Sequence, residues 1–297
     1  MKTTTKAHLA LLATNIFFAI NYTVVKYLIN SGYVKPFGLN LVRVGASAVL
    51  LWILFLFKPV KSVIAKKDYG RFFLCALTGI AINQLLFIKG LSLTYSIHAS
   101  LLMLTTPILI TVFAAWFLKE KLTNYKLAGL GLGIAGAVVL LMARESSGNA
   151  KEVLRGDIMI IMNAISYTLY FILVKPLMKA YNPVVVIRMI FTIGFFLILP
   201  FCWTEFTEIP WEQYNAIAWM NMGLIVICGT FLAYVFNVYG IKILGASIAG
   251  TYIYSQPLFA AIIAIIFLAE EVTVYKIVAA CLIFLGVFLT NKATRNA

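Results

Sequence analysis

Polar and aromatic side chains recur inside the long apolar segments of this sequence. Asn163, Tyr167 and Tyr170 follow one another at helical spacing, so they share one face of a helix. Two interpretations are open: hydrogen bonds between helices, worth about 0.6 kcal/mol each, or the lining of a cavity that binds an amphipathic metabolite. We expect part of the set to line such a cavity, and its members are Asn21, Asn83, Asn163, Tyr167, Tyr170, Tyr234, Tyr252 and Gln256.

Two arginines, Arg43 and Arg188, each lie about six residues inside an apolar segment. A cation at the centre of a membrane helix costs roughly 2.5–3.5 kcal/mol on insertion scales. Each arginine either extends to the interface and pairs with helix-end carbonyls, or faces a cavity and meets a substrate carboxylate or phosphate. Their equivalent positions indicate a shared role in gating or scaffolding. Lys26 and Lys175 lie near segment ends, where we expect snorkelling anchors.

Two prolines, Pro107 and Pro257, fall in the middle of apolar segments. Each removes one intrahelical hydrogen bond and frees a carbonyl one turn earlier. Thr105-Thr106 and Ser255-Gln256 precede them and could satisfy those carbonyls. The prolines therefore predict either fixed kinks or a hinge that gates a path.

The sequence lacks the residue patterns of a catalytic site. All ten acidic residues lie in loops or at segment ends, and there is no HExxH or GxSxG motif. The four cysteines lack metal-ligand spacing, and His98 has the position of a structural histidine. We therefore expect no enzyme, no metal and no cofactor. We also expect facilitated exchange, or coupling through another group, in place of coupling by a carboxylate in mid-membrane.

Composition sets the class of protein. Of 297 residues, 63% are hydrophobic and 11% are charged, whereas a soluble domain has about 45–50% apolar and about 25% charged residues. So few charges could not cover a soluble surface of this size, which excludes a water-soluble enzyme. We read the net charge of +14 as a label of membrane topology, not as a sign of nucleic-acid binding.

An apolar run of about 20 residues crosses a bilayer as a helix. The sequence predicts an all-α membrane protein with ten such helices, over residues 7–29, 38–57, 72–89, 96–118, 125–143, 156–177, 183–203, 215–238, 246–268 and 274–291. With the N-terminus in the cytoplasm, 15 basic residues fall on the cytoplasmic side and 6 outside. Because basic residues concentrate in cytoplasmic loops, this bias predicts that both termini are inside.

The sequence also aligns with itself at a shift of 150 residues. Gly79 meets Gly229, Pro107 meets Pro257, and Glu120 meets Glu270. A four-residue gap brings Arg43 opposite Arg188, and Lys26 pairs with Lys175. The shift predicts two repeats, residues 1–145 and 153–297, of five helices each. An odd number of spans inverts the second copy, which is typical of secondary transporters with a site near the midplane.

These residues resemble the ten-span, EamA-like branch of the drug/metabolite transporter superfamily over nearly the whole chain. The resemblance is carried by Ala19-Ile20-Asn21-Tyr22, Pro36, Arg43, Pro107, Glu120-Lys121-Leu122-Thr123, Gly133-Ile134-Ala135-Gly136, Pro257 and Glu270-Glu271-Val272-Thr273. Phe18-Ala19 stands where the family often has Trp-Gly.

The resemblance implies a carrier of the bacterial inner membrane that works by alternating access. We expect an exporter of small metabolites such as amino acids, as a monomer or homodimer in the lipid bilayer. Alternatives are a facilitative exchanger or importer of another anionic or amphipathic metabolite and, less favoured, a membrane-embedded enzyme.

Overall fold

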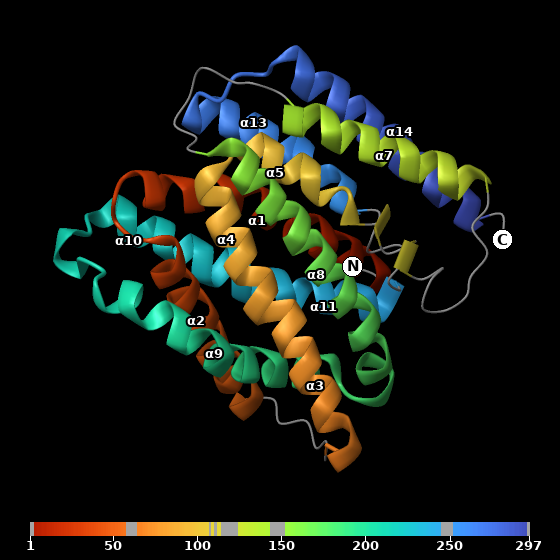
Figure 1. Ribbon diagram of the computed structural model, residues 1–297. Coiled ribbons are helices and arrows are strands. Elements are labelled where there is room, and N and C mark those ends of the chain that lie inside the picture. The colour runs from red at the N-terminus through yellow and green to blue at the C-terminus, as the bar shows by residue number, and fades with distance from the viewer. Residues whose placement is uncertain are drawn as a thin grey trace.

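The computed structural model describes residues 3–57, 64–106, 108–109, 112–113, 124–142, 152–244 and 252–295. Within these ranges the chain is a bundle of helices without strands (Figure 1). The all-α prediction is therefore confirmed.

The elements follow the order of the expected spans. The first half contains α1 (Thr3–Asn30), α2 (Pro36–Phe57), η1 (Lys66–Asp68), α3 (Tyr69–Ala76), η2 (Leu77–Ile82), α4 (Asn83–Leu93), α5 (Ser96–Met103) and α7 (Asn124–Met142). The second half contains α8 (Val153–Ala180), α9 (Pro183–Thr207), η3 (Trp211–Gln213), α10 (Ala216–Gly223), η4 (Leu224–Leu232), α11 (Ala233–Leu244), η5 (Ile253–Ser255), α13 (Gln256–Leu268) and α14 (Val274–Arg295).

Within the described residues, six helical stretches are long and apolar enough to cross a membrane: Thr3–Asn30, Pro36–Phe57, Lys66–Leu93, Val153–Ala180, Pro183–Thr207 and Ala216–Leu244. Leu127–Val139, Gln256–Leu268 and Val274–Gly286 are shorter apolar helices. About a third of the expected span 96–118 lies outside the described residues. The count of ten spans therefore stays a prediction.

The contacts between helices of the two halves follow the pattern expected of a repeat. α2 packs along α9 and α7 along α14, while α4 packs on α8 and α1 on α11 (Figure 1). In the predicted repeat, α2 is equivalent to α9 and α7 to α14, so these two pairs join equivalent helices. Because α4 is equivalent to α11 and α8 to α1, the other two pairs are equivalent to each other. The pattern supports the inverted repeat, which itself stays a prediction.

Both halves contain a π-helical segment at the same place in the repeat. Gly79 lies in η2 and Gly229 in η4, at the shift of 150 residues. A Cβ atom on Gly79 would lie 2.5 Å from the Tyr170 ring, and one on Gly229 would lie 2.6 Å from the Asn21 amide oxygen. Only glycine allows α8 and α1 to approach these segments so closely.

A carboxylate of α9 caps the N-terminus of α2. Glu205 of α9 accepts hydrogen bonds from the amides of Phe37 and Gly38 in the first turn of α2, at 2.6 and 3.2 Å. Next to it, Lys35 pairs with Glu208 at 2.5 Å on the exposed surface. The hydrogen bond and the negative charge of Glu208 raise the pKa of Lys35 above its ordinary value. The Glu205 cap fixes the crossing of α2 and α9, because its carboxylate satisfies first-turn amides of α2 that have no partner within that helix.

A kink or hinge at the prolines stays a prediction. Pro257 lies in the first turn of α13, directly after the 3-10 segment η5, so the type of helix changes at this proline. A proline is tolerated in a first turn because the amide that it lacks has no partner there. The hydroxyls bond carbonyls other than those four residues before the prolines: Ser255 donates to the carbonyl of Tyr252, and Thr105 donates to that of Leu102, each at 2.7 Å. Pro107 lies outside the described residues.

Gly156 marks the closest crossing of α8 with the end of α4. A Cβ atom on Gly156 would lie 2.8 Å from the carbonyl oxygen of Gly90 and 2.8 Å from the amide nitrogen of Thr94. Backbone on both sides leaves no flexible group that could give way. We predict that Gly156→Ala lowers the free energy of unfolding by about 1–3 kcal/mol, as overpacking does, measured by thermal unfolding in detergent.

Gly131 of α7 provides the control, because a Cβ atom there has nothing within 4 Å. Gly131→Ala should leave stability unchanged or raise it slightly, since alanine favours a helix interior over glycine. Equal melting temperatures for the two variants would contradict the close crossing at Gly156.

Candidate functional site

Arg43 of α2 is buried between helices of both halves, with 2% of its surface exposed. Its Nε donates to the hydroxyl of Thr230 in η4 at 3.2 Å, and that hydroxyl donates to the carbonyl of Ile225 at 2.9 Å. Its Nη1 is buried and has no hydrogen-bond partner among the described residues. A buried guanidinium with spare donors is suited to a carboxylate or phosphate.

Gln84 of α4 faces the same part of the second half. Its side-chain nitrogen donates to the hydroxyl of Tyr234 in α11 at 3.0 Å. Its Oε1 is buried and lacks a hydrogen-bond partner within the described chain. Tyr234 also packs edge-on against Phe191 and Phe18, with ring centroids 5.0 and 6.2 Å away, so its hydroxyl is held in place.

Two tyrosines of α8 complete this region. The ring centroids of Tyr167 and Tyr170 lie 5.8 Å apart, and both rings are half-buried. Both hydroxyls lie near that of Tyr234, as does the Arg43 guanidinium. We call this set the central cluster; it comprises Arg43, Gln84, Tyr167, Tyr170, Thr230 and Tyr234. Arg43, Tyr167, Tyr170 and Tyr234 were expected from the sequence, whereas Thr230 was not, because a threonine in an apolar segment usually bonds its own helix.

Asn83 and Asn163 join α4 to α8. The side-chain nitrogen of Asn163 donates to the backbone carbonyl of Asn83 at 2.7 Å. The side-chain nitrogen of Asn83 donates to the backbone carbonyl of Asn163 at 3.4 Å. Ser166, one turn later, donates to the carbonyl of Thr78 at 2.7 Å. These contacts are interhelical hydrogen bonds, the first of the two interpretations given above for polar residues within spans. A substrate-binding role for this pair stays a prediction.

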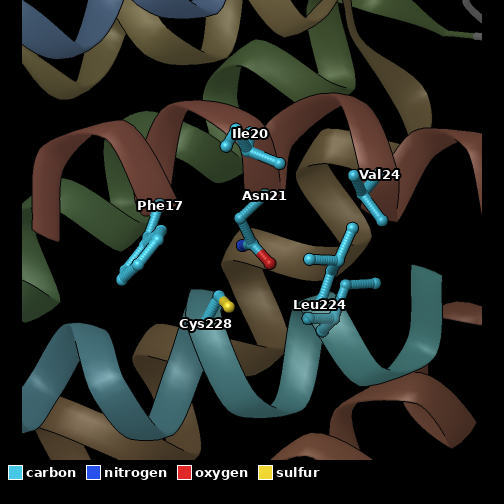
Figure 2. A pocket seen from close by; sticks show the side chains of 7 residues that line it. Phe17, Ile20, Asn21, Val24, Leu224 and Cys228 are labelled. Carbon is cyan, nitrogen blue, oxygen red and sulfur yellow. The ribbon is translucent and has the colours of Figure 1, made fainter. Parts of the chain in front are cut away.

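Asn21 lines a small cavity between α1 and η4 (Figure 2). Its amide oxygen is buried without a hydrogen-bond partner among the described residues. The cavity measures about 40 Å³ and is lined by Phe17, Ile20, Asn21, Val24, Leu224, Ile225 and Cys228. This volume has room for a few water molecules, each of which needs about 10–15 Å³, and not for an amino acid. A metabolite could therefore reach Asn21 here only if α1 and η4 moved apart.

Tyr252 and Gln256 bond to the first half of α1, away from the partners of Arg43. The Gln256 amide nitrogen donates to the Asn15 amide oxygen at 2.6 Å, and Asn15 donates to the carbonyl of Leu11 at 2.7 Å. The Tyr252 hydroxyl lies 2.7 Å from Nδ1 of His8. These residues tie η5 and α13 to α1, and no contact joins them to Arg43 among those described.

Arg188 has surroundings unlike those of Arg43. Its guanidinium carbon lies 3.6 Å from the ring centroid of Phe55 and 4.3 Å from that of Trp52. The Trp52 indole donates to the hydroxyl of Thr192 at 2.9 Å and lies on the outer surface of the bundle. The Nε and Nη1 of Arg188 are buried without hydrogen-bond partners among the described residues, and the two rings stabilise the cation by stacking. The equivalence of the two arginines in sequence does not extend to their contacts.

Lys26 was expected to snorkel, and the structure corrects this. Its ammonium is buried and lies 3.4 Å from a carboxylate oxygen of Glu270. Glu270 also accepts from the backbone amides of Ser96 at 2.8 Å and Ile97 at 3.1 Å, which begin α5. Lys26 lies 5.3 Å from the centre of the Tyr95 ring. The carboxylate needs the lysine because its backbone partners leave its charge uncompensated.

This buried pair yields a prediction. Lys26→Met leaves the Glu270 carboxylate buried without its cation, and breaking such a pair costs about 3–5 kcal/mol. We expect a large drop in melting temperature in detergent, partly recovered in the double variant Lys26→Met/Glu270→Gln. Lys35→Met, in the exposed pair, should leave the melting temperature unchanged. A Lys26→Met protein as stable as the Lys35→Met protein would contradict the buried pair.

Two known proteins are similar to this chain over most of its length. It is 26% identical over 296 residues to the "Uncharacterized transporter YyaM" of Bacillus subtilis (strain 168), covering 97% of this chain and 94% of that protein. It is 25% identical over 229 residues to the "Probable terminal-alkyne amino-acid exporter" of Streptantibioticus cattleyicolor, covering 77% of this chain and 75% of that protein.

A solved crystal structure of another protein shares the fold, with a TM-score of 0.64, 18% identity, and coverage of 99% of this chain and 97% of that chain. The model of the EamA-like transporter family matches twice, over residues 5–142 and 154–292. Together these matches account for nearly all of the sequence. The chain therefore belongs to the EamA-like transporter family and is a membrane transporter.

Proposed function

We propose that this transporter exports small metabolites that carry both a carboxylate and an amino group, such as amino acids, across the bacterial inner membrane. The observation that carries the proposal is the pair of unused groups in the central cluster. Arg43 Nη1 is a buried donor and Gln84 Oε1 a buried acceptor, each without a hydrogen-bond partner in the described residues. Leaving such groups unpaired costs about 1–3 kcal/mol each, more when charged.

An amino acid would satisfy both groups at once. Its carboxylate can accept from the Arg43 guanidinium, and its ammonium can donate to the Gln84 amide oxygen. Both protein groups lie next to Tyr234, through the hydrogen bond of Gln84 and the charge of Arg43. The rings of Tyr167, Tyr170 and Tyr234 would then face the side chain of the substrate, where an aromatic surface accepts apolar groups and cations alike.

The central cluster is shared by the two halves of the chain. The central cluster takes Arg43 and Gln84 from the first half and Thr230, Tyr234 and the α8 tyrosines from the second. Relative motion of the halves would therefore change the site, as alternating access requires. The family matches over residues 5–142 and 154–292 support repeats within 1–145 and 153–297, and the basic residues support cytoplasmic termini.

The comparisons favour an amino acid over other anions. One relative carries the name of an amino-acid exporter. A facilitative exchanger or importer of another anionic metabolite is the second candidate, because Arg43 would bind any carboxylate or phosphate. An amino acid should outcompete the matching carboxylic acid without an amino group, since only the former pairs with Gln84.

Counterflow in proteoliposomes tests the function. Vesicles loaded with a mixture of amino acids and diluted into one labelled amino acid should accumulate the label above the level of protein-free vesicles. The exchange should be repeated for a panel that includes aromatic, aliphatic and acidic amino acids. Absence of counterflow across the whole panel would refute the proposal.

Arg43 and Arg188 form a matched pair of variants. Arg43→Gln should raise the apparent KM for amino acids at least about tenfold, because a charge-assisted hydrogen bond contributes about 1.5–3 kcal/mol. Arg188→Gln, which alters an arginine that stacks on Trp52 and Phe55, should keep the KM within about twofold. An unchanged KM in Arg43→Gln, or equal losses in both variants, would remove Arg43 from the substrate site.

A further inference from the structure

The buried side of α2 carries three polar residues, Asn40, Arg43 and Ser47. Steps of three and four residues each correspond to about one helical turn, so the three side chains lie in line along the helix. We call this set the polar face of α2. Asn40 and Ser47 are fully buried, as is nearly all of Arg43.

The polar face of α2 points away from the lipid. The opposite side of α2 is apolar and exposed at Val49, Ile53 and Leu56, which is the side expected to contact lipid in a membrane transporter. The polar face is turned toward the second half of the chain, because Arg43 donates to Thr230 in η4 and α2 packs against both α9 and η4. It therefore lies between the two halves, where alternating access would open a path.

All three residues have buried polar atoms without hydrogen-bond partners among the described residues. These atoms are the side-chain nitrogen and oxygen of Asn40, Nη1 of Arg43 and the Ser47 hydroxyl oxygen, four of the twelve such atoms in the described parts of the chain. The Cys202 thiol of α9 lies near the Asn40 amide, but a thiol is only a weak hydrogen-bond partner. A hydroxyl in a helix can donate to a carbonyl one turn earlier, as that of Thr78 does; the Ser47 hydroxyl, within the described α2, does not.

A face used only for packing would gain nothing from these polar groups. Burying a polar atom without a partner costs free energy, and an apolar face would pack the same helices without that cost. Ionisable side chains inside a membrane bundle mark substrate and ion pathways, and Arg43 lies at the centre of this face. The proposed substrate supplies the missing partners: a carboxylate for the donors of Asn40, Arg43 and Ser47, and an ammonium for the Asn40 amide oxygen.

We infer that the polar face of α2 is one wall of the route by which the substrate crosses the protein, with Asn40 and Ser47 as binding subsites on either side of Arg43. The inference rests on the proposed transport function. At a rise of about 1.5 Å per residue, Asn40 lies about 4.5 Å and Ser47 about 6 Å from Arg43 along the helix axis. Steps of this size let a carboxylate bond the next group as it leaves the last. With both termini in the cytoplasm, as the basic residues predict, an exported substrate meets Ser47 first and Asn40 last.

Removal of the polar groups distinguishes a binding role from a structural one. In Asn40→Leu and in Ser47→Ala, the maximal rate of amino-acid counterflow in proteoliposomes should fall at least about threefold, because the substrate loses a hydrogen bond during its passage. The melting temperature of the substrate-free protein should stay the same or rise, because each substitution removes a buried group that lacks a partner. A smaller fall in the rate, in either correctly inserted variant, would overturn the inference.

Asn15 and Ser166 provide matched controls, because both are buried and hydrogen-bonded. Asn15 bonds through both of its amide atoms, and the Ser166 hydroxyl donates to the carbonyl of Thr78. Asn15→Leu and Ser166→Ala should lower the melting temperature and keep the rate of counterflow per inserted protein within about twofold. An equally large drop in melting temperature in Asn40→Leu and Ser47→Ala would show that both residues hold the helices together, and would overturn the inference.

Thiol labelling tests the route whatever the substrate is. Ser47→Cys places a thiol on the polar face of α2, and Cys75 of α3, which is fully buried among apolar side chains, is the internal control. The water-soluble, negatively charged reagent MTSES should modify the new thiol at least about tenfold faster than Cys75 in proteoliposomes, as measured by mass spectrometry of the peptides. A rate no higher than that of Cys75 would overturn the inference.

The two experiments separate the route from the proposed function. Absence of wild-type counterflow across the whole amino-acid panel would refute the proposed function, and a reactive thiol in Ser47→Cys would then still support the route. Wild-type counterflow together with an unreactive thiol in Ser47→Cys would refute only the route.

Discussion

The constraint on which this structure depends is that the membrane offers no water to polar groups, so each one has to find its partner inside the chain. Lys26 meets Glu270, Asp157 meets His98 and Thr94, and Asn163 meets the backbone of Asn83. Each of these contacts joins elements far apart in the sequence. The polar residues therefore decide how the apolar helices are arranged, because apolar surface gains nothing from leaving lipid for a helix neighbour.

The same constraint makes a buried polar group without a partner a candidate for binding a ligand. A donor on Arg43 and an acceptor on Gln84 are among the buried polar atoms that remain without partners within the described residues, and both belong to the central cluster. Arg188 shows that a buried cation can be accommodated in another way, by stacking on Trp52 and Phe55. The two arginines therefore differ in their surroundings: Arg43 lies beside polar groups of the second half, and Arg188 lies against aromatic rings.

Much of the fold could be predicted from the sequence, because apolar length and composition determine helices in a membrane. The family resemblance also followed from residue type and spacing. Arg43, Tyr167, Tyr170 and Tyr234 were candidate site residues, and the sequence did not predict that they lie together. The partners could not be predicted. Lys26 resembled a snorkelling anchor because its partner lies 244 residues away. Such pairings depend on tertiary packing, which periodicity does not encode.

The π-helical segments carry a mechanical consequence. A π turn accommodates an additional residue relative to an α turn, and one residue corresponds to about 100° of rotation in an α-helix. η4 contains Thr230 and directly precedes Tyr234. If η4 relaxed to α geometry, Tyr234 would rotate by about that angle relative to the start of η4, and its hydroxyl would leave Gln84. A change of one residue in helical register would thus dismantle the central cluster without any helix leaving its place in the bundle.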